Sequence, residues 1–330
     1  MATELIDSYG RKIDNLRISV TDRCNFRCRY CMPVEGMTWL AHDEILTYEE
    51  IVKITKVLLS MGIRKIRLTG GEPLIRKELP GLVAGLKGLD GLRDLALTTN
   101  GYFLKDQAGD LARAGLGRVN VSLDSLDRQT FEKMARRDHL ERILGGIEAA
   151  LGAGISPVKI NVVLIRGIND GEIESFALLA RDSPLIVRFV EFMPIGSDDG
   201  WSNDRVITTA EILERLSAIG LPAVPVSRDD GHPADRYRFE DGAGEIGFIS
   251  SVSRPFCDSC NRIRLTSDGK LRTCLFSTVE TDLKGPVRSG AGADDIRALV
   301  RGAVAAKEEG HQINQPGFVR PERTMSAIGG

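Results

Sequence analysis

The arrangement of the cysteines is the feature that most constrains this chain. Six cysteines occur in 330 residues. They form two tight groups of three, namely Cys24, Cys28 and Cys31, and then Cys257, Cys260 and Cys274. In a reducing compartment, such clustered thiols favour metal or redox chemistry over disulfides. The N-terminal residues include Glu4, Asp7 and Asp14 and lack the apolar core of a signal peptide, so we expect a cytoplasmic protein.

Length and charge narrow the classes of function. The chain is long enough for one large domain of roughly 200–250 residues with a smaller addition. Its net charge is −2 at pH 7, which gives no global basic field for nucleic acid or an anionic membrane surface. No apolar run approaches the ~20 residues of a membrane span, so we expect no membrane segment. A site for an anion must therefore be built from a few local arginines.

Strand and helix patterns alternate through the first two thirds of the chain. The predicted strands are Leu16–Thr21, Lys65–Thr69, Asp94–Thr99, Arg118–Leu123, Val158–Leu164 and Ile186–Phe192. The clearest helical periods between them are Tyr48–Ser60, Ala108–Ala114, Leu140–Leu151 and Glu172–Leu179. Thr47 and Glu50 form a capping box at the start of the first helix. Strand–helix units in series predict a parallel α/β fold, either an incomplete barrel or a doubly wound sheet, with active residues at the C-terminal ends of strands.

The pattern changes after about Leu221, and we predict a larger region over residues 1–221 and a smaller one over residues 222–330. A predicted linker that contains several prolines begins at Pro222. The runs Arg262–Thr266 and Lys270–Cys274 flank a Ser-Asp-Gly turn and predict a hairpin. The segment Asp294–Glu309 is typical of a final helix.

The first group of cysteines has the spacing C-x3-C-x2-C directly after a predicted strand. Three thiolates this close can hold three corners of an iron–sulfur cluster and leave one iron open to a ligand. Spacing alone leaves a zinc site completed by a distant residue as the alternative. With Gly70-Gly71-Glu72-Pro73 after the next strand, the motif resembles the radical S-adenosylmethionine (SAM) superfamily. That resemblance implies an incomplete (β/α)6 TIM-like barrel and a 4Fe-4S cluster that binds SAM.

The second group combines a C-x2-C pair, Cys257 and Cys260, with Cys274 after the predicted hairpin. On its own this pattern favours a zinc ribbon. Arg262 and Arg264 share one face of a strand and suit a phosphate group, although alternating arginines are also common on solvated edge strands. Taken together, the cysteines, the Asn-Arg-Ile-Arg run and the hairpin resemble the GTP 3′,8-cyclase family, also called molybdenum cofactor biosynthesis protein A. The resemblance covers nearly the whole chain.

The family resemblance implies roles for individual residues. The first three cysteines hold the SAM cluster, and the second three hold an auxiliary 4Fe-4S cluster. The implied SAM contacts are Tyr30, Gly71, Ser122 and Met193. The implied GTP contacts are Arg17, Arg67, Thr98, Lys159, Arg262, Ile263 and Arg264, with Arg188 and Lys65 as further candidates. The terminal Gly329 and Gly330 are implied to reach into the active site. Three of the cations interrupt apolar strands, and because an unpaired buried charge is costly, this also favours a shared anion site.

The implied activity is conversion of GTP to (8S)-3′,8-cyclo-7,8-dihydroguanosine 5′-triphosphate, the first step of molybdenum cofactor (molybdopterin) biosynthesis. A 5′-deoxyadenosyl radical would remove the ribose 3′ hydrogen, and the resulting C3′ radical would attack C8 of guanine. The implied partners are an electron donor such as a flavodoxin-type reductant and cyclic pyranopterin monophosphate synthase, which would take the product. A homodimer is left open.

Two other functions stay open from the sequence. A radical SAM peptide maturase with an auxiliary cluster would carry further C-terminal cysteines, and this chain has none after Cys274. A zinc-bearing module for nucleic acid would need a basic face and aromatic platforms, but aromatic residues make up only 5% of the chain.

Overall fold

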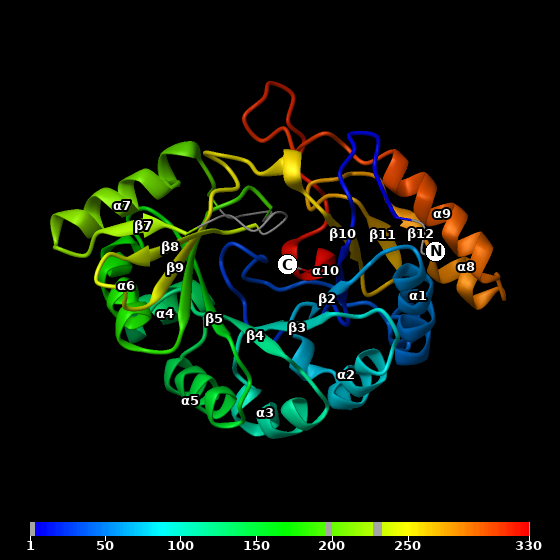
Figure 1. Cartoon of the computed structure of the whole chain (residues 1–330), viewed down its shortest axis with the longest axis horizontal. Coiled ribbons are helices and arrows are strands. Elements are labelled where there is room, and N and C mark those ends of the chain that lie inside the picture. Colours follow the sequence, from blue (N-terminus) through cyan, green and yellow to red (C-terminus); the bar gives the residue numbers. More distant parts are fainter. Residues whose placement is uncertain (1–3, 196–199, 227–232, 330) are drawn as a thin grey trace.

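The computed structural model describes residues 4–195, 200–226 and 233–329. Six parallel strands lie side by side in the order of the sequence: β1 (Asn15–Ser19), β2 (Lys65–Thr69), β3 (Asp94–Thr99), β4 (Arg118–Ser122), β5 (Val158–Leu164) and β6 (Ile186–Glu191). Because this order never reverses, the sheet winds in one direction, as in a barrel, and is not doubly wound. The predicted incomplete (β/α)6 barrel is confirmed, and Figure 1 shows the strands inside an arc of helices.

The helices of the barrel region follow the predicted pattern, with three additions. They are α1 (Tyr48–Ser60), α2 (Leu79–Lys87), α3 (Leu104–Arg113), α4 (Arg128–Ala135), α5 (Leu140–Gly152), α6 (Ile173–Asp182) and α7 (Thr209–Ala218). The capping box of Thr47 and Glu50 at the start of α1 is confirmed. Helices α2, α4 and α7 were not predicted, because α2 contains Pro80 and two glycines and α4 is short and polar. None of the helices in the described ranges has both the length and the apolar character of a membrane span.

The C-terminal region extends the same sheet at both edges. Beyond β6 lie β9 (Glu245–Ile249), which is parallel to it, and then the antiparallel β8 (Asp235–Phe239) and β7 (Ala223–Pro225). Beyond β1 lie β10 (Arg262–Leu265), which is parallel to it, and then the antiparallel β11 (Lys270–Arg272) and β12 (Thr281–Asp282). The predicted hairpin is therefore confirmed as β10 and β11. The predicted linker was partly wrong, because it contains β7, an edge strand, where proline is tolerated.

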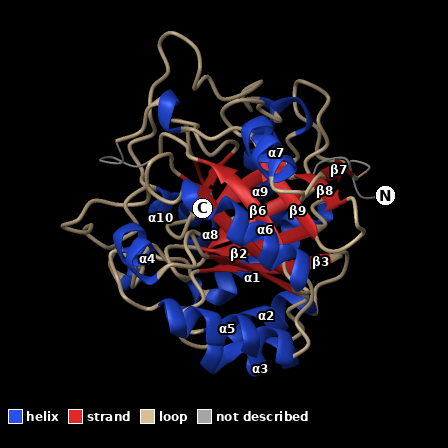
Figure 2. Ribbon diagram, turned by 90° about the vertical axis from the view of Figure 1, so that its left-hand side faces the viewer, coloured by secondary structure: helices blue, strands red, loops and turns tan. Residues whose placement is uncertain are grey.

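Three further helices complete the chain: α8 (Lys284–Arg288), α9 (Ala293–Ala305) and α10 (Met325–Ile328). Helix α9 is the predicted final helix, and α10 is a short addition in the tail that had no clear period. Figure 1 shows α10 inside the arc of strands, and Figure 2 shows α2, α3 and α5 gathered on one side of the sheet. The division at residue 221 stays a prediction.

Alternation along the strands separates the core from the barrel interior. In β5, Val158, Ile160 and Val162 pack in the apolar core, whereas Asn161 and Val163 point to the interior. Successive side chains of a strand face opposite sides. The apolar set therefore lies under the helices, and the polar set is left to line the interior.

The apolar layer under the helices predicts a large cost for its truncation. Phe176 on α6 is fully buried, whereas Leu178 on the same helix is 41% exposed. We expect Phe176→Ala to lower the free energy of unfolding by about 3–5 kcal/mol, because it leaves a cavity. Leu178→Ala, the matched control, should change it by less than about 0.5 kcal/mol. Anaerobic urea denaturation measures both, and equal effects would contradict this assignment of the core.

Candidate active site

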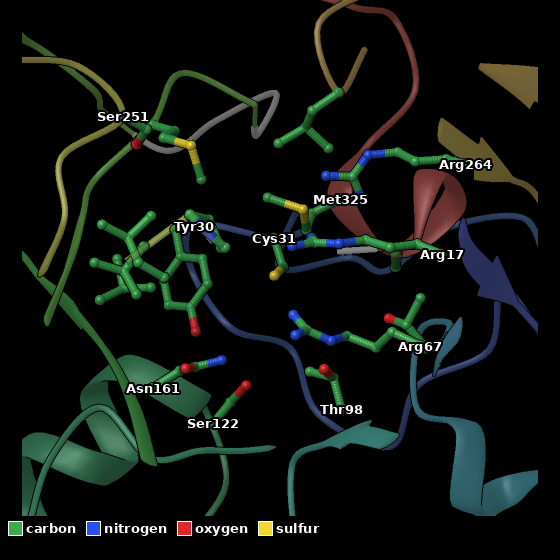
Figure 3. Close-up of a pocket in the computed structure, with 18 of the residues that line it drawn as sticks. Arg17, Tyr30, Cys31, Arg67, Thr98, Ser122, Asn161, Ser251, Arg264 and Met325 are labelled. Carbon is green, nitrogen blue, oxygen red and sulfur yellow. The ribbon is translucent and has the colours of Figure 1, made fainter. Parts of the chain in front are cut away.

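One cavity joins the C-terminal ends of the barrel strands to both groups of cysteines. All six cysteines line it. So do most of the other predicted site residues: Arg17, Tyr30, Arg67, Gly71, Thr98, Ser122, Met193, Arg262 and Arg264. Figure 3 shows Arg17, Arg67 and Arg264 extending into this space from one side, with Tyr30, Ser122 and Asn161 on the other. Side chains from distant parts of the sequence therefore converge where the barrel fold predicts activity.

The loop of the first cysteine group is fixed to the C-terminal end of α4. The backbone N–H groups of Arg27 and Arg29 donate to the carbonyls of Ala135 and Met134, each at 3.1 Å. Burial raises the pKa of the Cys28 thiol, and the neighbouring Cys31 raises it further. Closely packed, buried thiols of this kind are stabilised as thiolates when a metal group binds and replaces their protons.

The predicted glycine turn packs directly on the segment before Cys24. The N–H of Gly71 donates to the carbonyl of Thr21 at 2.8 Å. A Cβ atom at Gly71 would lie 2.4 Å from the carbonyl oxygens of Asp22 and Arg23. Only glycine allows this approach. The turn thus sets the position of the backbone that leads into the cysteine loop.

Tyr30, between two of the cysteines, is held by a buried carboxyl group. Its hydroxyl donates to Oδ2 of Asp124 at 2.7 Å, and the N–H of Val163 donates to Oδ1 at 2.9 Å. Burial raises the pKa of Asp124 to about 6. Sequence reasoning missed Asp124, although an acidic residue just beyond a predicted strand was a usable signal.

The second cysteine group lies beside the edge strand β10. Cys257 begins a single turn, Cys260 precedes β10, and Cys274 follows β11. The Sγ atom of Cys260 accepts from Nη2 of Arg262 at 3.5 Å. Burial alone would raise the pKa of Cys260, but Arg262 and Lys307 outweigh it and lower this pKa to about 6. The thiolate form is thus favoured before any metal binds.

Cations crowd the barrel interior. Arg17 pairs in register with Arg264 on one side and with Arg67 on the other. Desolvation, and then the neighbouring arginines, lower the pKa of Arg17 and Arg67 well below the usual value. In the described part of the chain, neither residue forms an ion pair with a carboxylate, and the Nε atoms of Arg67 and Arg188 are buried without a partner. The interior therefore has an excess of positive charge that an anion would neutralise.

The other predicted residues lie around this cavity in different ways. Lys159 faces the interior two residues before Asn161 and is not among the residues lining the cavity. The side chain of Ile263 is fully buried in the apolar core, on the opposite face of β10 from Arg262 and Arg264. Lys65 lies 3.8 Å from Asp14 in an ion pair. Of Ile263, only the backbone is therefore available to a ligand in the cavity.

The C-terminal tail enters the barrel at β1 and β10. The carbonyl of Gly329 accepts from Nη1 of Arg264 at 2.8 Å. Gly329 has a φ of +86°, and a Cβ there would lie 2.7 Å from Cβ of Ser19. Glycine is thus required by both conformation and space. Gly330 lies outside the described residues.

Several lining residues had no predicted role. They include Asn161, Ser251, His311, Met325 and Ser326. Oδ1 of Asn161 and Nδ1 of His311 are buried without a hydrogen-bond partner in the described structure. Asn161 shares a strand face with Lys159, so alternation could have found it. The tail residues carry no periodic pattern, and nothing in the sequence indicated their place.

The donor set fits two iron–sulfur clusters. Each group offers three thiols to one cavity, so that a cubane cluster held there would keep one iron without a protein thiolate. In the described ranges, no three Cys, His, Asp or Glu side chains are gathered tightly enough to hold a single metal ion. A cubane cluster takes its thiolates farther apart, at separate corners.

Comparisons with known proteins agree with this arrangement. Residues 18–180 match the family model "Radical SAM superfamily", and residues 185–313 match "Molybdenum Cofactor Synthesis C". A GTP 3′,8-cyclase from Pelotomaculum thermopropionicum is 49% identical over 325 residues, covering 98% of this chain and 99% of the relative. One from Thermodesulfovibrio yellowstonii is 46% identical with the same coverage. A crystal structure of Streptococcus suis SuiB bound to S-adenosylmethionine covers 95% of this chain and 78% of that chain, with a TM-score of 0.62 and 12% identity, and it supports the fold alone.

The contact at Gly71 predicts that this position does not accept a side chain. We expect Gly71→Ala to lower the free energy of unfolding by about 1–3 kcal/mol, because the added methyl group displaces the backbone before Cys24. It should also reduce the iron retained by the first cysteine group. Gly81→Ala is the control, because a Cβ there meets no atom within 4 Å. Equal stability and equal iron content in both variants would contradict this role of the turn.

Proposed function

The chain belongs to the GTP 3′,8-cyclase family of radical SAM enzymes, and from this premise we propose how its residues carry the family's reaction. It converts GTP to (8S)-3′,8-cyclo-7,8-dihydroguanosine 5′-triphosphate, the first step of molybdenum cofactor biosynthesis. Its cofactors are SAM and two 4Fe-4S clusters. One observation carries the assignment of residues: the two cysteine groups line one cavity, and in the described structure the arginines that line it have no carboxylate partner.

The first cysteine group and its surroundings hold the SAM end of the cavity. Cys24, Cys28 and Cys31 would bind the cluster that also binds SAM, and the bound SAM supplies the carbon radical that removes a hydrogen atom from the ribose. Tyr30, Gly71, Ser122 and Met193 are the proposed SAM contacts, and they all line the cavity. The protein contributes position here, because a radical must form close to one C–H bond.

The arginines hold the other reactant. We assign Arg17, Arg67, Arg262 and Arg264 to the triphosphate and Thr98, Lys159 and the backbone of Ile263 to further GTP contacts. Guanidinium groups suit phosphate because each offers several donors in a fixed fork. Cys257, Cys260 and Cys274 would hold the auxiliary cluster, which would supply a binding site for the guanine base. Gly329 supports Arg264 through its carbonyl, and Gly330 is proposed to act beside it.

The competing functions are not favoured. The relatives of a nearly equal length are GTP 3′,8-cyclases, and the second family model describes molybdenum cofactor synthesis. The likeness to SuiB, at 12% identity, supports the fold alone and gives no support for a peptide maturase. A zinc-bearing binding module does not account for the radical SAM match over residues 18–180.

The partners and the compartment follow from the chemistry. We propose a cytoplasmic protein, because six free thiols that carry clusters need a reducing compartment. A flavodoxin-type donor would supply the electron, and cyclic pyranopterin monophosphate synthase would take the product. A homodimer is consistent with this scheme and is no part of the site proposed here.

The direct test is an anaerobic assay of the reconstituted protein with SAM, GTP and dithionite, followed by mass spectrometry. We expect 5′-deoxyadenosine together with a cyclised product isomeric with dihydro-GTP. Formation of 5′-deoxyadenosine without conversion of GTP would contradict the assignment of GTP as the substrate. Absence of both products from protein shown to hold its clusters would contradict the reaction.

The different roles proposed for the two cysteine groups predict that removing a cysteine from each group abolishes different reactions. Cys257→Ala should still cleave SAM, because the first group is intact, but it should form no cyclised GTP. Cys24→Ala is the matched control and should abolish both reactions. Quantifying 5′-deoxyadenosine and the cyclised nucleotide in each variant checks this. Unimpaired cyclisation by Cys257→Ala would refute the auxiliary site.

Lys159 predicts a pH dependence of GTP binding. Burial, and then Arg188, lower the pKa of Lys159 to about 8. Below that pH the side chain is charged and attracts the triphosphate, and above it the charge is lost. The affinity for GTP should therefore fall by up to about tenfold between about pH 7 and about pH 9. Equilibrium binding across this range measures it, and Lys159→Arg, which stays charged, should flatten the profile. The same slope in Lys159→Arg would contradict the assignment.

A further inference from the structure

A short segment after α9, residues 307–311, wraps the second cysteine group. The backbone at Gly310 packs so closely that a Cβ there would lie 3.2 Å from Sγ of Cys257. The guanidinium of Arg11 donates to the carbonyl of Cys257 at 2.8 Å and to that of Glu308 at 2.6 Å. The segment and Cys257 are therefore fixed to each other through one side chain.

Lys307 joins the two strands that present the other two cysteines. Its side chain is almost fully buried, with the residue 3% exposed. Its Nζ donates to the carbonyl of Arg262 at 3.3 Å and also to the carbonyl of Thr273. Arg262 lies two residues after Cys260, and Thr273 directly precedes Cys274. One ammonium group thus spans β10 and β11 at the places where both strands meet the cysteines.

The charge of Lys307 has no carboxylate partner within ion-pair distance in the described structure. Two other buried cations of this region differ in this respect. Arg11 is paired with Asp7 at 2.6 Å, and Arg272 forms an ion pair with Glu280 at 2.5 Å. A buried ammonium group needs a counter-charge. The second cysteine group can supply one, because Nζ of Lys307 lies at the carbonyls of Arg262 and Thr273, two residues after Cys260 and one residue before Cys274.

We propose that Lys307 is a positioning and charge-compensating residue of the auxiliary cluster. It holds β10 and β11 together behind the cysteines and stabilises the negative charge of the thiolates and of the reduced cluster. Lys307 does not line the cavity, so it acts on the cluster and not on the substrate. The proposal rests on the proposed function, because it requires a cluster at this cysteine group.

This role has a redox consequence. Reduction adds one electron to the cluster, and a buried positive charge beside it favours that more negative state. Removing the charge should therefore make the midpoint potential more negative. Loss of the link between β10 and β11 should also weaken the hold on iron.

The experiment compares Lys307→Gln with Lys307→Arg in the full-length chain. Both are made in a parent in which Cys24, Cys28 and Cys31 are alanine, so that only the auxiliary cluster is present. Redox titration followed by electron paramagnetic resonance gives the potential, and transfer of iron to a chelator gives retention. We expect Lys307→Gln, which keeps donors but no charge, to have a more negative potential and to release iron about 10- to 100-fold faster. Lys307→Arg should stay close to the parent.

Glu308→Gln is the matched control on the same segment. Its two carboxylate oxygens accept separately from the hydroxyls of Thr273 and Ser277. In glutamine the amide oxygen can keep one of these bonds, and the NH2 group can donate to the other hydroxyl. Removing this negative charge should shift the potential in the opposite direction. A purely structural disturbance would shift the midpoint potentials of Glu308→Gln and Lys307→Gln in the same direction.

The outcomes separate the parts of the proposal. A parent-like potential and parent-like iron release in Lys307→Gln would overturn it, as would equal shifts in Lys307→Gln and Lys307→Arg. If Lys307→Gln holds no cluster and Lys307→Arg does, the requirement for charge is upheld. If neither holds one, charge compensation is refuted. A parent chain without a cluster would refute the auxiliary site of the proposed function, and this inference with it.

Discussion

Excess positive charge inside the barrel is the constraint on which the rest of this structure depends. Alternation along β1, β2 and β6 sends Arg17, Arg67 and Arg188 into one interior. Such a cluster of guanidinium groups is unfavourable by itself, because desolvation and mutual repulsion act together. It persists because the opposite faces of the same strands bury a continuous apolar layer under the helices. Stability is supplied on one side of the sheet, and an anion-binding surface is maintained on the other.

The sequence predicted the strands and the site cysteines of this arrangement, because both are visible as local patterns. The ranges of β2, β3 and β5 were predicted residue for residue, since each is a β-branched or apolar run bounded by glycine, proline or polar residues. The site cysteines were equally visible, because thiols at such short spacing in a reducing compartment favour a metal or redox site. Arg17 and Arg67 stood out for a related reason, as charges within otherwise apolar strands.

What the sequence did not show depends on contacts between distant segments. Asp124 reaches Tyr30 across 94 positions, and Lys307 reaches Arg262 across 45. No pattern within a window of ten or twenty residues contains either pair. Ile263 illustrates a different limit, because the family resemblance named it as a GTP contact although its side chain lies in the core while its neighbours face the cavity. Motifs locate a site, whereas the fold decides which atoms of the motif face it.

The sheet also explains why the second cysteine group belongs to the barrel. β10 is hydrogen-bonded to β1 in parallel, and this register sets Arg264 beside Arg17. Cys260 and Cys274 are attached to β10 and β11, so their distance from the first group is fixed by backbone pairing and not by a flexible linker. A reaction that joins the ribose to the guanine base within one bound GTP molecule requires this constancy, because a displacement of about 1 Å can cost about a hundredfold in rate. The continuous sheet therefore contributes to the reaction by fixing the distance between the two cysteine groups.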